Sequence, residues 1–130
     1  MQAFIDTSYF FARLVQRDQW HQKAKRAVVP QLTTVTSSLV INETVSLLQA
    51  RNMFSAALTF LRGVRSQPDL RIVYVDPALQ AEAWDLFGRW GASGATVVDC
   101  ASFAIMRRLS IRRAFTIDQH FAAAGFQILR

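Results

Sequence analysis

The sequence predicts a three-layer α/β/α fold built on a mostly parallel central sheet. Short apolar segments rich in β-branched residues alternate along the chain with longer segments of helical spacing, a pattern typical of this class. Two of the apolar segments end in an acid, where the ligands of such sheets usually bind. The 130 residues, 52% of them hydrophobic, fit one domain over residues 1–130 with a substantial core.

The first part of the chain predicts a strand, two helices and a second strand. Ala3–Asp6 is a short apolar run ending in an acid, which favours a strand. Ser8 suits a helix N-cap, and Tyr9–Arg17 carries apolar residues at helical spacing. A second helix is expected from Asp18, and the β-branched run Leu32–Thr36 predicts the next strand.

The middle of the chain predicts three helices and one strand. Ser38–Arg51 and Phe54–Arg65 both have helical spacing. Arg71–Val75 follows a turn and alternates toward Val and Tyr, so it predicts a strand. Pro77 suits a first helical position, and the helix that it opens should run to about Trp90.

The last part predicts a loop, two helices and two strands. Gly91–Gly94 indicates the loop, and Thr96 should begin a helix that reaches about Leu109. Ala114–Asp118 is again a short apolar segment ending in an acid. A brief helix should end near Gly125, and Phe126–Leu129 then predicts an edge strand.

Composition narrows the function classes. The net charge is +6, and 13 of the 15 basic residues are Arg, which pairs well with phosphate and favours a polyanionic partner. The alternative is an Arg-rich codon bias with solvated charges. No stretch is apolar enough to span a membrane, and no secretory signal is visible. The single cysteine fits a reducing compartment, so we expect a cytoplasmic protein.

Four acids lie in apolar surroundings: Asp6, Glu43, Asp99 and Asp118. Asp6, Asp99 and Asp118 could each simply cap a helix, and Glu43 could pair with an Arg. If the four converge, however, two charges about 4 Å apart repel by roughly 4 kcal/mol at an effective dielectric near 20. A cation must then offset them, and hard oxygen ligands suit Mg²⁺ or Mn²⁺. No His or Cys spacing indicates zinc.

These acids lie in segments that resemble the motifs of PIN-domain proteins, specifically the VapC-type toxins of toxin–antitoxin pairs. The resembling segments are Asp6–Thr7–Ser8 with Asp18–x–x–His21, Thr36–Glu43, Asp99–Ala104, and Thr116–Phe121 with Gly125–Phe126. They occur in order over essentially the whole chain. The resemblance implies a PIN-like fold and a Mg²⁺-dependent endoribonuclease that is neutralised by a cognate antitoxin and forms a homodimer.

The resemblance also implies site roles. Asp6, Glu43, Asp99 and Asp118 take the positions of the family's acidic residues; we expect Asp6 and Asp99 to ligate metal directly, and Glu43 and Asp118 directly or through water. Three neighbouring hydroxyls and two basic residues are further candidates for substrate or water contacts: Thr7, Ser8, Thr116, Arg107 and Arg108. The hydroxyls suit caps equally well, and the two arginines suit the end of a helix.

Other groups favour structural roles. Cys100 falls at helical spacing with apolar neighbours, which indicates core packing. His120 lies two residues past Asp118 and could approach a substrate, but a surface histidine is the favoured interpretation. Gly91–Gly94 could clamp a phosphate, but a loop that needs positive φ is favoured. Two rival functions stay open: a nucleic-acid-binding module without catalysis, and a DNA or structure-specific nuclease with the same metal site.

Overall fold

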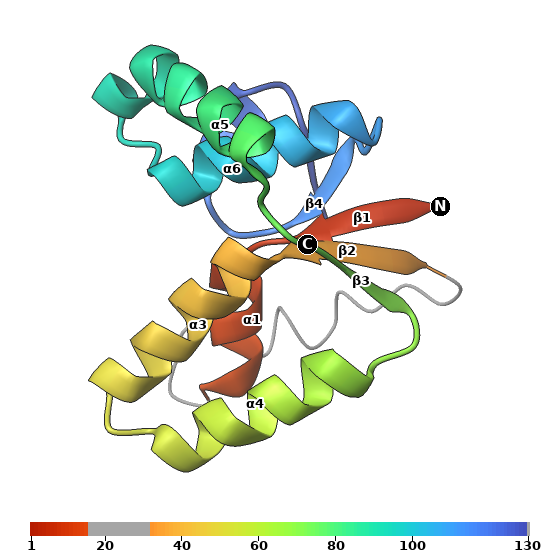
Figure 1. Cartoon of the computed structure of the whole chain (residues 1–130), viewed down its shortest axis with the longest axis vertical. Helices are drawn as coiled ribbons and strands as arrows, with labels where there is room; N and C mark the ends of the chain where they lie inside the picture. Colours follow the sequence, from red (N-terminus) through yellow and green to blue (C-terminus); the bar gives the residue numbers. More distant parts are fainter. Residues whose placement is uncertain (16–31, 130) are drawn as a thin grey trace.

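The central sheet is entirely parallel. The computed structural model describes residues 1–15 and 32–129. Within them, five strands pair in the order β3-β2-β1-β4-β5 (Figure 1). The strands are β1 (Gln2–Ile5), β2 (Thr33–Ser37), β3 (Leu70–Val73), β4 (Arg113–Phe115) and β5 (Gln127–Leu129). Phe4 aligns with Val35 on one side and with Ala114 on the other, so β1 is central and buried on both faces.

Helices cover both faces of the sheet, which confirms the predicted three-layer class. Figure 1 shows α1, α3 and α4 on one side and α5 and α6 on the other. The described helices are α1 (Thr7–Leu14), α3 (Ser38–Ala50), α4 (Phe54–Ser66), α5 (Pro77–Trp90), the 3₁₀ turn η1 (Gly91–Ser93), α6 (Val97–Arg108) and α7 (Gln119–Ala123). Their starts are encoded locally: the hydroxyl of Ser37 caps α3, and the carboxylate of Asp76 caps α5 beside the expected Pro77.

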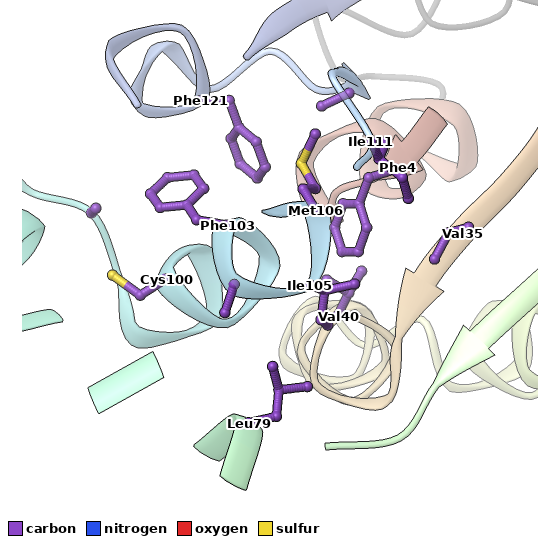
Figure 2. Packing of buried hydrophobic residues seen from close by; sticks show 13 residues of the cluster. Phe4, Val35, Val40, Leu79, Cys100, Phe103, Ile105, Met106, Ile111 and Phe121 are labelled. Atoms are coloured by element: carbon purple, nitrogen blue, oxygen red, sulfur yellow. The ribbon is translucent and has the colours of Figure 1, made fainter. Parts of the chain in front are cut away.

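Helix α6 forms the centre of one of the two helical layers. Every residue from Asp99 to Met106 is buried, because α6 packs between the sheet and α5. Figure 2 shows Phe103 and Phe121 facing each other in this core, with ring centroids 5.0 Å apart. Cys100 is fully buried, and burial raises the pKa of its thiol, which agrees with the predicted packing role.

Within residues 1–15 and 32–129, the predicted strands and helices are correct in kind and order, and the differences lie at their ends. The predicted strand Ala114–Asp118 stops at Phe115, because the polar groups of Thr116 and Asp118 bond to side chains instead of the sheet. The predicted strand Arg71–Val75 ends at Val73. The helix predicted from Asp18 lies outside the described residues. Within residues 1–15 and 32–129, no helix has the length and apolarity needed to cross a bilayer.

The strand order creates a topological switch point beside β1. From β1 the chain moves outward through β2 to β3, and it then returns to the other side of β1 through β4 and β5. The connection after β1 therefore leads toward β2, and the connection after the adjacent strand β4 leads the opposite way across the sheet, toward β5. Ligands of parallel sheets bind at such a switch point, beyond the carboxyl ends of the strands. Asp6 follows β1 there, and Asp118 follows β4.

Candidate active site

Asp6 is held rigidly at the end of β1. Its backbone N–H donates to the carbonyl of Phe115 at 3.1 Å, which continues the pairing of β1 with β4 for one more residue. The side chain is 3% exposed, and its Oδ2 accepts from the hydroxyls of Ser8 and Thr116, at 2.8 Å each. Burial raises the pKa of Asp6 and outweighs the opposite effect of the two hydroxyls.

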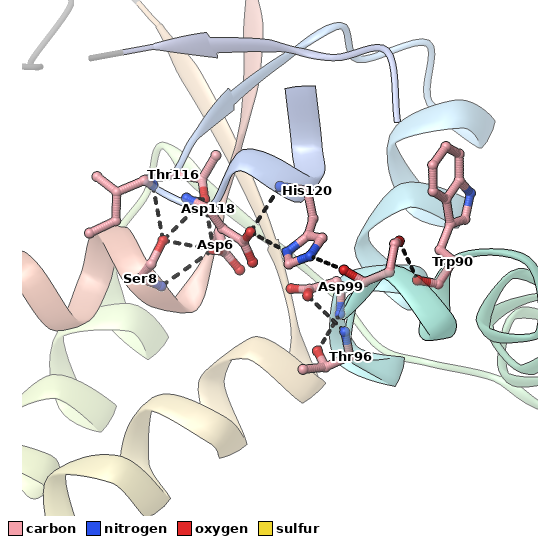
Figure 3. A network of polar contacts seen from close by, with 10 residues as sticks. Asp6, Ser8, Trp90, Thr96, Asp99, Thr116, Asp118 and His120 are labelled. Atoms are coloured by element: carbon pink, nitrogen blue, oxygen red, sulfur yellow. Dashed lines mark hydrogen bonds and ion pairs between the residues drawn. The ribbon is translucent and has the colours of Figure 1, made fainter. Parts of the chain in front are cut away.

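The hydroxyls of Ser8 and Thr116 connect Asp6 to the segment after β4. The N–H of Ile117 donates to the Ser8 hydroxyl at 3.1 Å, and the N–H of Asp118 donates to the Thr116 hydroxyl at 3.0 Å (Figure 3). Each hydroxyl has a single hydrogen, and these accepted bonds leave it to be donated to Asp6. The network therefore fixes the Asp6 carboxylate relative to both strands.

Asp99 lies in the first turn of α6, in a capping box with Thr96. The N–H of Thr96 donates to Oδ2 of Asp99 at 2.9 Å, and the N–H of Asp99 donates to the Thr96 hydroxyl at 3.1 Å. The residue is 6% exposed, and burial raises its pKa to about 6 against the hydrogen bonds with Thr96. The cap predicted for this acid is thus present, and the same cap orients its carboxylate.

Asp118 caps α7 and is joined to His120. Its Oδ1 accepts from the backbone N–H of His120 at 2.9 Å, and Nδ1 of the same residue lies 2.6 Å from that oxygen. Nε2 of His120 lies 3.0 Å from the carbonyl oxygen of Ser93 in η1. These contacts raise the pKa of His120, and the hydrogen bond to the Ser93 carbonyl has the largest effect. One carboxylate oxygen each of Asp99 and Asp118 and one ring nitrogen of His120 all lie within 4.8 Å of one another.

The three aspartates share one electrostatic environment. The charges of Asp6 and Asp118 both raise the pKa of Asp99, and the charge of Asp118 raises that of Asp6. Within the described part of the chain, no Lys or Arg forms an ion pair with any of them, and the basic group in contact with them is His120, whose Nδ1 lies 2.6 Å from Asp118. The partial positive charges at the N-termini of α1, α6 and α7 offset part of the repulsion. The remaining negative charge favours a bound cation.

A divalent metal fits this donor set. The hydrogen bonds described above fall on one oxygen of each carboxylate: Oδ2 of Asp6, Oδ2 of Asp99 and Oδ1 of Asp118. The second oxygen of each is therefore available to a ligand. Two of the three groups are almost fully buried, where an ionised carboxylate needs a compensating charge. Carboxylate oxygens are the donors that Mg²⁺ and Mn²⁺ prefer.

Four further predicted site residues are Glu43, Thr7, Arg107 and Arg108. Glu43 is half-buried in the second turn of α3 and has no side-chain partner among the described residues. The buried hydroxyl of Thr7, next to Asp6, likewise has no partner there. The structure does not bring Arg107 and Arg108 to the acids. They end α6 about 13 Å of helix rise beyond Asp99, and Arg108 pairs with Glu82.

His120 makes contacts that the sequence interpretation did not identify. It was expected at the surface, and its side chain is 34% exposed, but its ring nitrogens have partners on both sides. The short spacing from Asp118 is the only local signal. Its second partner, Ser93, lies 27 residues away along the chain, so no local pattern could have identified that contact.

Comparisons with known proteins agree with this fold and site. Residues 3–127 match the PIN domain family. The chain is 34% identical over 128 residues to 23S rRNA-specific endonuclease VapC20 of Mycobacterium tuberculosis, covering 98% of this chain and 97% of that protein. The crystal structure of M. tuberculosis VapC20, described as a sarcin–ricin loop cleaving toxin, matches with a TM-score of 0.86 at 33% identity over 95% of each chain.

A more distant solved structure shares the fold alone. FitAcB from Neisseria gonorrhoeae matches with a TM-score of 0.68 at 14% identity, over 100% of this chain and 97% of that chain. The match to the family model, the close relative and its structure all agree with the resemblance found in the sequence motifs. The chain therefore belongs to the PIN-domain family, as a nuclease of the VapC type.

Proposed function

We propose that this protein, as one domain over residues 1–130, is a metal-dependent endoribonuclease that hydrolyses RNA phosphodiester bonds. The observation that carries the proposal is the group of three electrostatically coupled aspartates at the switch point, with no Lys or Arg pairing within the described residues. VapC20, at 34% identity, is named for cleavage of 23S rRNA. Structured ribosomal RNA is therefore the first substrate to test.

Asp6, Asp99 and Asp118 would hold Mg²⁺, or Mn²⁺, through their second carboxylate oxygens, with Glu43 as a fourth carboxylate acting directly or through water. A bound divalent ion would lower the pKa of water and stabilise charge on phosphoryl oxygens. The chain's own contribution is to position these groups. Ser8 and Thr116 fix Asp6, and Thr96 fixes Asp99. Asp99, with a pKa of about 6, would be ionised near neutral pH.

The proposed partners follow from the family. A cognate antitoxin protein would neutralise the nuclease, and a homodimer would form through an apolar face of α4 that includes Phe54. Phe54 is 61% exposed, and several other large apolar side chains among the described residues are exposed too, so its exposure permits this interface without requiring it. We expect the protein to act in the cytoplasm, where its RNA substrate and its single reduced thiol would be found.

The test is cleavage of purified RNA with Mg²⁺ or Mn²⁺. Asp6→Asn and Asp99→Asn should each lower the cleavage rate by at least about 100-fold, because each removes a charge from the metal site. Asp85→Asn is the matched control, since Asp85 is exposed on α5 and far in sequence from the site residues. It should cleave like the unmodified protein.

Two other outcomes identify the rival functions. RNA binding that weakens steeply with salt, without metal-dependent turnover, would indicate a binding module instead of an enzyme. Preferred cleavage of single-stranded DNA over RNA would indicate a DNA nuclease with the same metal site. Cleavage of RNA by both Asp→Asn site variants at the unmodified rate would show that the assigned site is wrong.

A further inference from the structure

His120 connects two segments that carry carboxylates. Nδ1 of its ring lies 2.6 Å from Oδ1 of Asp118, after β4, and Nε2 lies 3.0 Å from the carbonyl of Ser93, just before α6 (Figure 3). The Ser93 carbonyl can only accept, so Nε2 donates to it, and an ionised Asp118 carboxylate accepts from Nδ1 when the ring carries its second proton. The imidazole is thereby held at both ends, between the strand end that carries Asp118 and the turn that leads to Asp99.

The turn after α5 contacts the imidazole ring closely at Gly94. Gly94 has φ +104°, and a Cβ at this position would lie only 3.1 Å from Nε2 of His120. The N–H of Gly94 donates to the carbonyl of Gly91 at 3.0 Å, and the Ser93 hydroxyl donates to the carbonyl of Trp90 at 2.8 Å. The turn is therefore well ordered by its own bonds, and it presents the Ser93 carbonyl to the ring at a defined place.

The ring is not needed for helix capping. Asp118 caps α7 through the backbone N–H of His120, a bond that any residue except proline would make at this position. The contact from Nδ1 is additional to the cap. Both ring nitrogens already lie within hydrogen-bond distance of oxygen atoms, so the ring as placed is engaged on both sides. The contact of Nδ1 with Oδ1 of Asp118 therefore restricts the orientation of the Asp118 carboxylate.

We propose that His120 is a positioning residue for the metal site. Its Nδ1–H holds Oδ1 of Asp118 so that the second oxygen stays directed toward the site. Its Nε2–H fixes the ring on Ser93 and so sets the spacing between Asp118 and the start of α6. The inference rests on the proposed function, since it assigns His120 a part in the metal site of that nuclease. Groups that orient metal ligands typically change metal affinity or activity by about 10–100-fold.

Amide substitutions separate the two ring contacts. The amide nitrogen of an asparagine side chain can replace Nδ1, and that of a glutamine can replace Nε2. Calorimetric titration of the metal-free full chain with MnCl₂ and MgCl₂ should show about tenfold weaker binding for His120→Ala, with both metals affected equally. His120→Asn should recover most of this loss, because it still donates to Asp118. His120→Gln should not.

Other results would overturn the proposal. Equal affinity of His120→Ala and the unmodified chain would show that the ring does not orient Asp118. A loss confined to Mn²⁺, without recovery in His120→Asn, would identify the ring as a direct metal ligand. Metal binding is measured without RNA, so the two proposals can fail separately. An unmodified chain that binds metal but cleaves no RNA would contradict the proposed nuclease function. The titrations of the His120 variants would still decide whether His120 positions Asp118.

Two glycines supply a matched pair that tests the same contact from the other side. Gly94 and Gly125 have nearly the same φ, +104° and +100°, but a Cβ at Gly125 would meet nothing within 4 Å. Gly94→Ala should weaken metal binding, though by less than His120→Ala, because its Cβ would shift the ring by only a few tenths of an ångström. Gly125→Ala should lower thermal stability alone. In the His120→Ala background, Gly94→Ala should have no further effect on metal affinity. Additive losses there would contradict the proposed coupling.

Discussion

The two ends of the α5–α6 layer differ in whether their charged side chains are paired. At the C-terminal end of α6, Arg108 contacts Glu82 with its Nε and Nη2 at 3.0 and 2.9 Å, and both side chains are more than a third exposed. At the N-terminal end, Asp99 is 6% exposed among two further aspartates and without a basic partner in the described part of the chain. The surface pair neutralises itself in water, whereas the buried acids do not.

The two groups of charges differ in their effect on stability. An exposed ion pair contributes about 0–1 kcal/mol and tolerates loss. Burial of Asp99 raises its pKa from 3.8 to about 6, which disfavours its ionised form in the folded protein. If stability alone mattered, an apolar residue at position 99 or a basic side chain beside it would serve better than an unpaired carboxylate. The arrangement is reasonable if a cation supplies the missing charge.

The largest expected effect concerns the stability of the metal-free protein. Because the folded-state pKa of Asp99 lies above its unfolded value, the folded state loses stability as pH rises from about 4 to about 6. Asp99→Asn removes this loss and can still accept from the N–H of Thr96. At pH 7.5 in EDTA we expect a gain of about 2 kcal/mol, or roughly 7 °C in Tm.

The pH dependence is the control for this prediction. At pH 4 the gain should shrink below about 1 kcal/mol, since Asp99 is then protonated in the folded protein. Excess Mg²⁺ should raise the Tm of the unmodified chain and not that of the variant. A Tm of Asp99→Asn below that of the unmodified chain at pH 7.5 would mean that the carboxylate is compensated within the protein.

Substitution of Glu43 tests whether the metal site includes a fourth carboxylate. It is half-buried and has no side-chain partner among the described residues, so Glu43→Gln should leave the metal-free Tm nearly unchanged. If Glu43 contributes to the site, the variant should bind Mn²⁺ about tenfold more weakly in calorimetric titration. Unchanged affinity would restrict the metal site to the three aspartates.

The smallest expected effect belongs to the surface pair. Arg108→Ala should change the free energy of unfolding by less than about 1 kcal/mol in urea denaturation, because the pair is exposed. RNA cleavage should stay at the unmodified rate, since Arg108 lies at the end of α6 away from Asp99. A large loss of cleavage would instead support the predicted contact of Arg107 and Arg108 with RNA.

The sequence by itself determined the fold class and the order of its elements. Apolar β-branched segments alternate with helical ones, and local capping groups such as Ser37, Asp76 and Thr96 start helices where the pattern predicts them. It also identified the acids, because a carboxylate next to a buried strand or helix start is conspicuous without a structure. Their roles as metal ligands stay predictions, and so does the role of Glu43.

Only the tertiary structure decided which of these groups meet. The strand order brings Asp6 and Asp118 to neighbouring strand ends, and packing of α6 adds Asp99. The same packing places Arg108 at the far end of the helix and the Ser93 carbonyl against His120. Local sequence sets the period and ends of each element through short-range sterics and capping. Contacts between residues far apart in the chain depend on how whole elements pack, and no single segment encodes that packing.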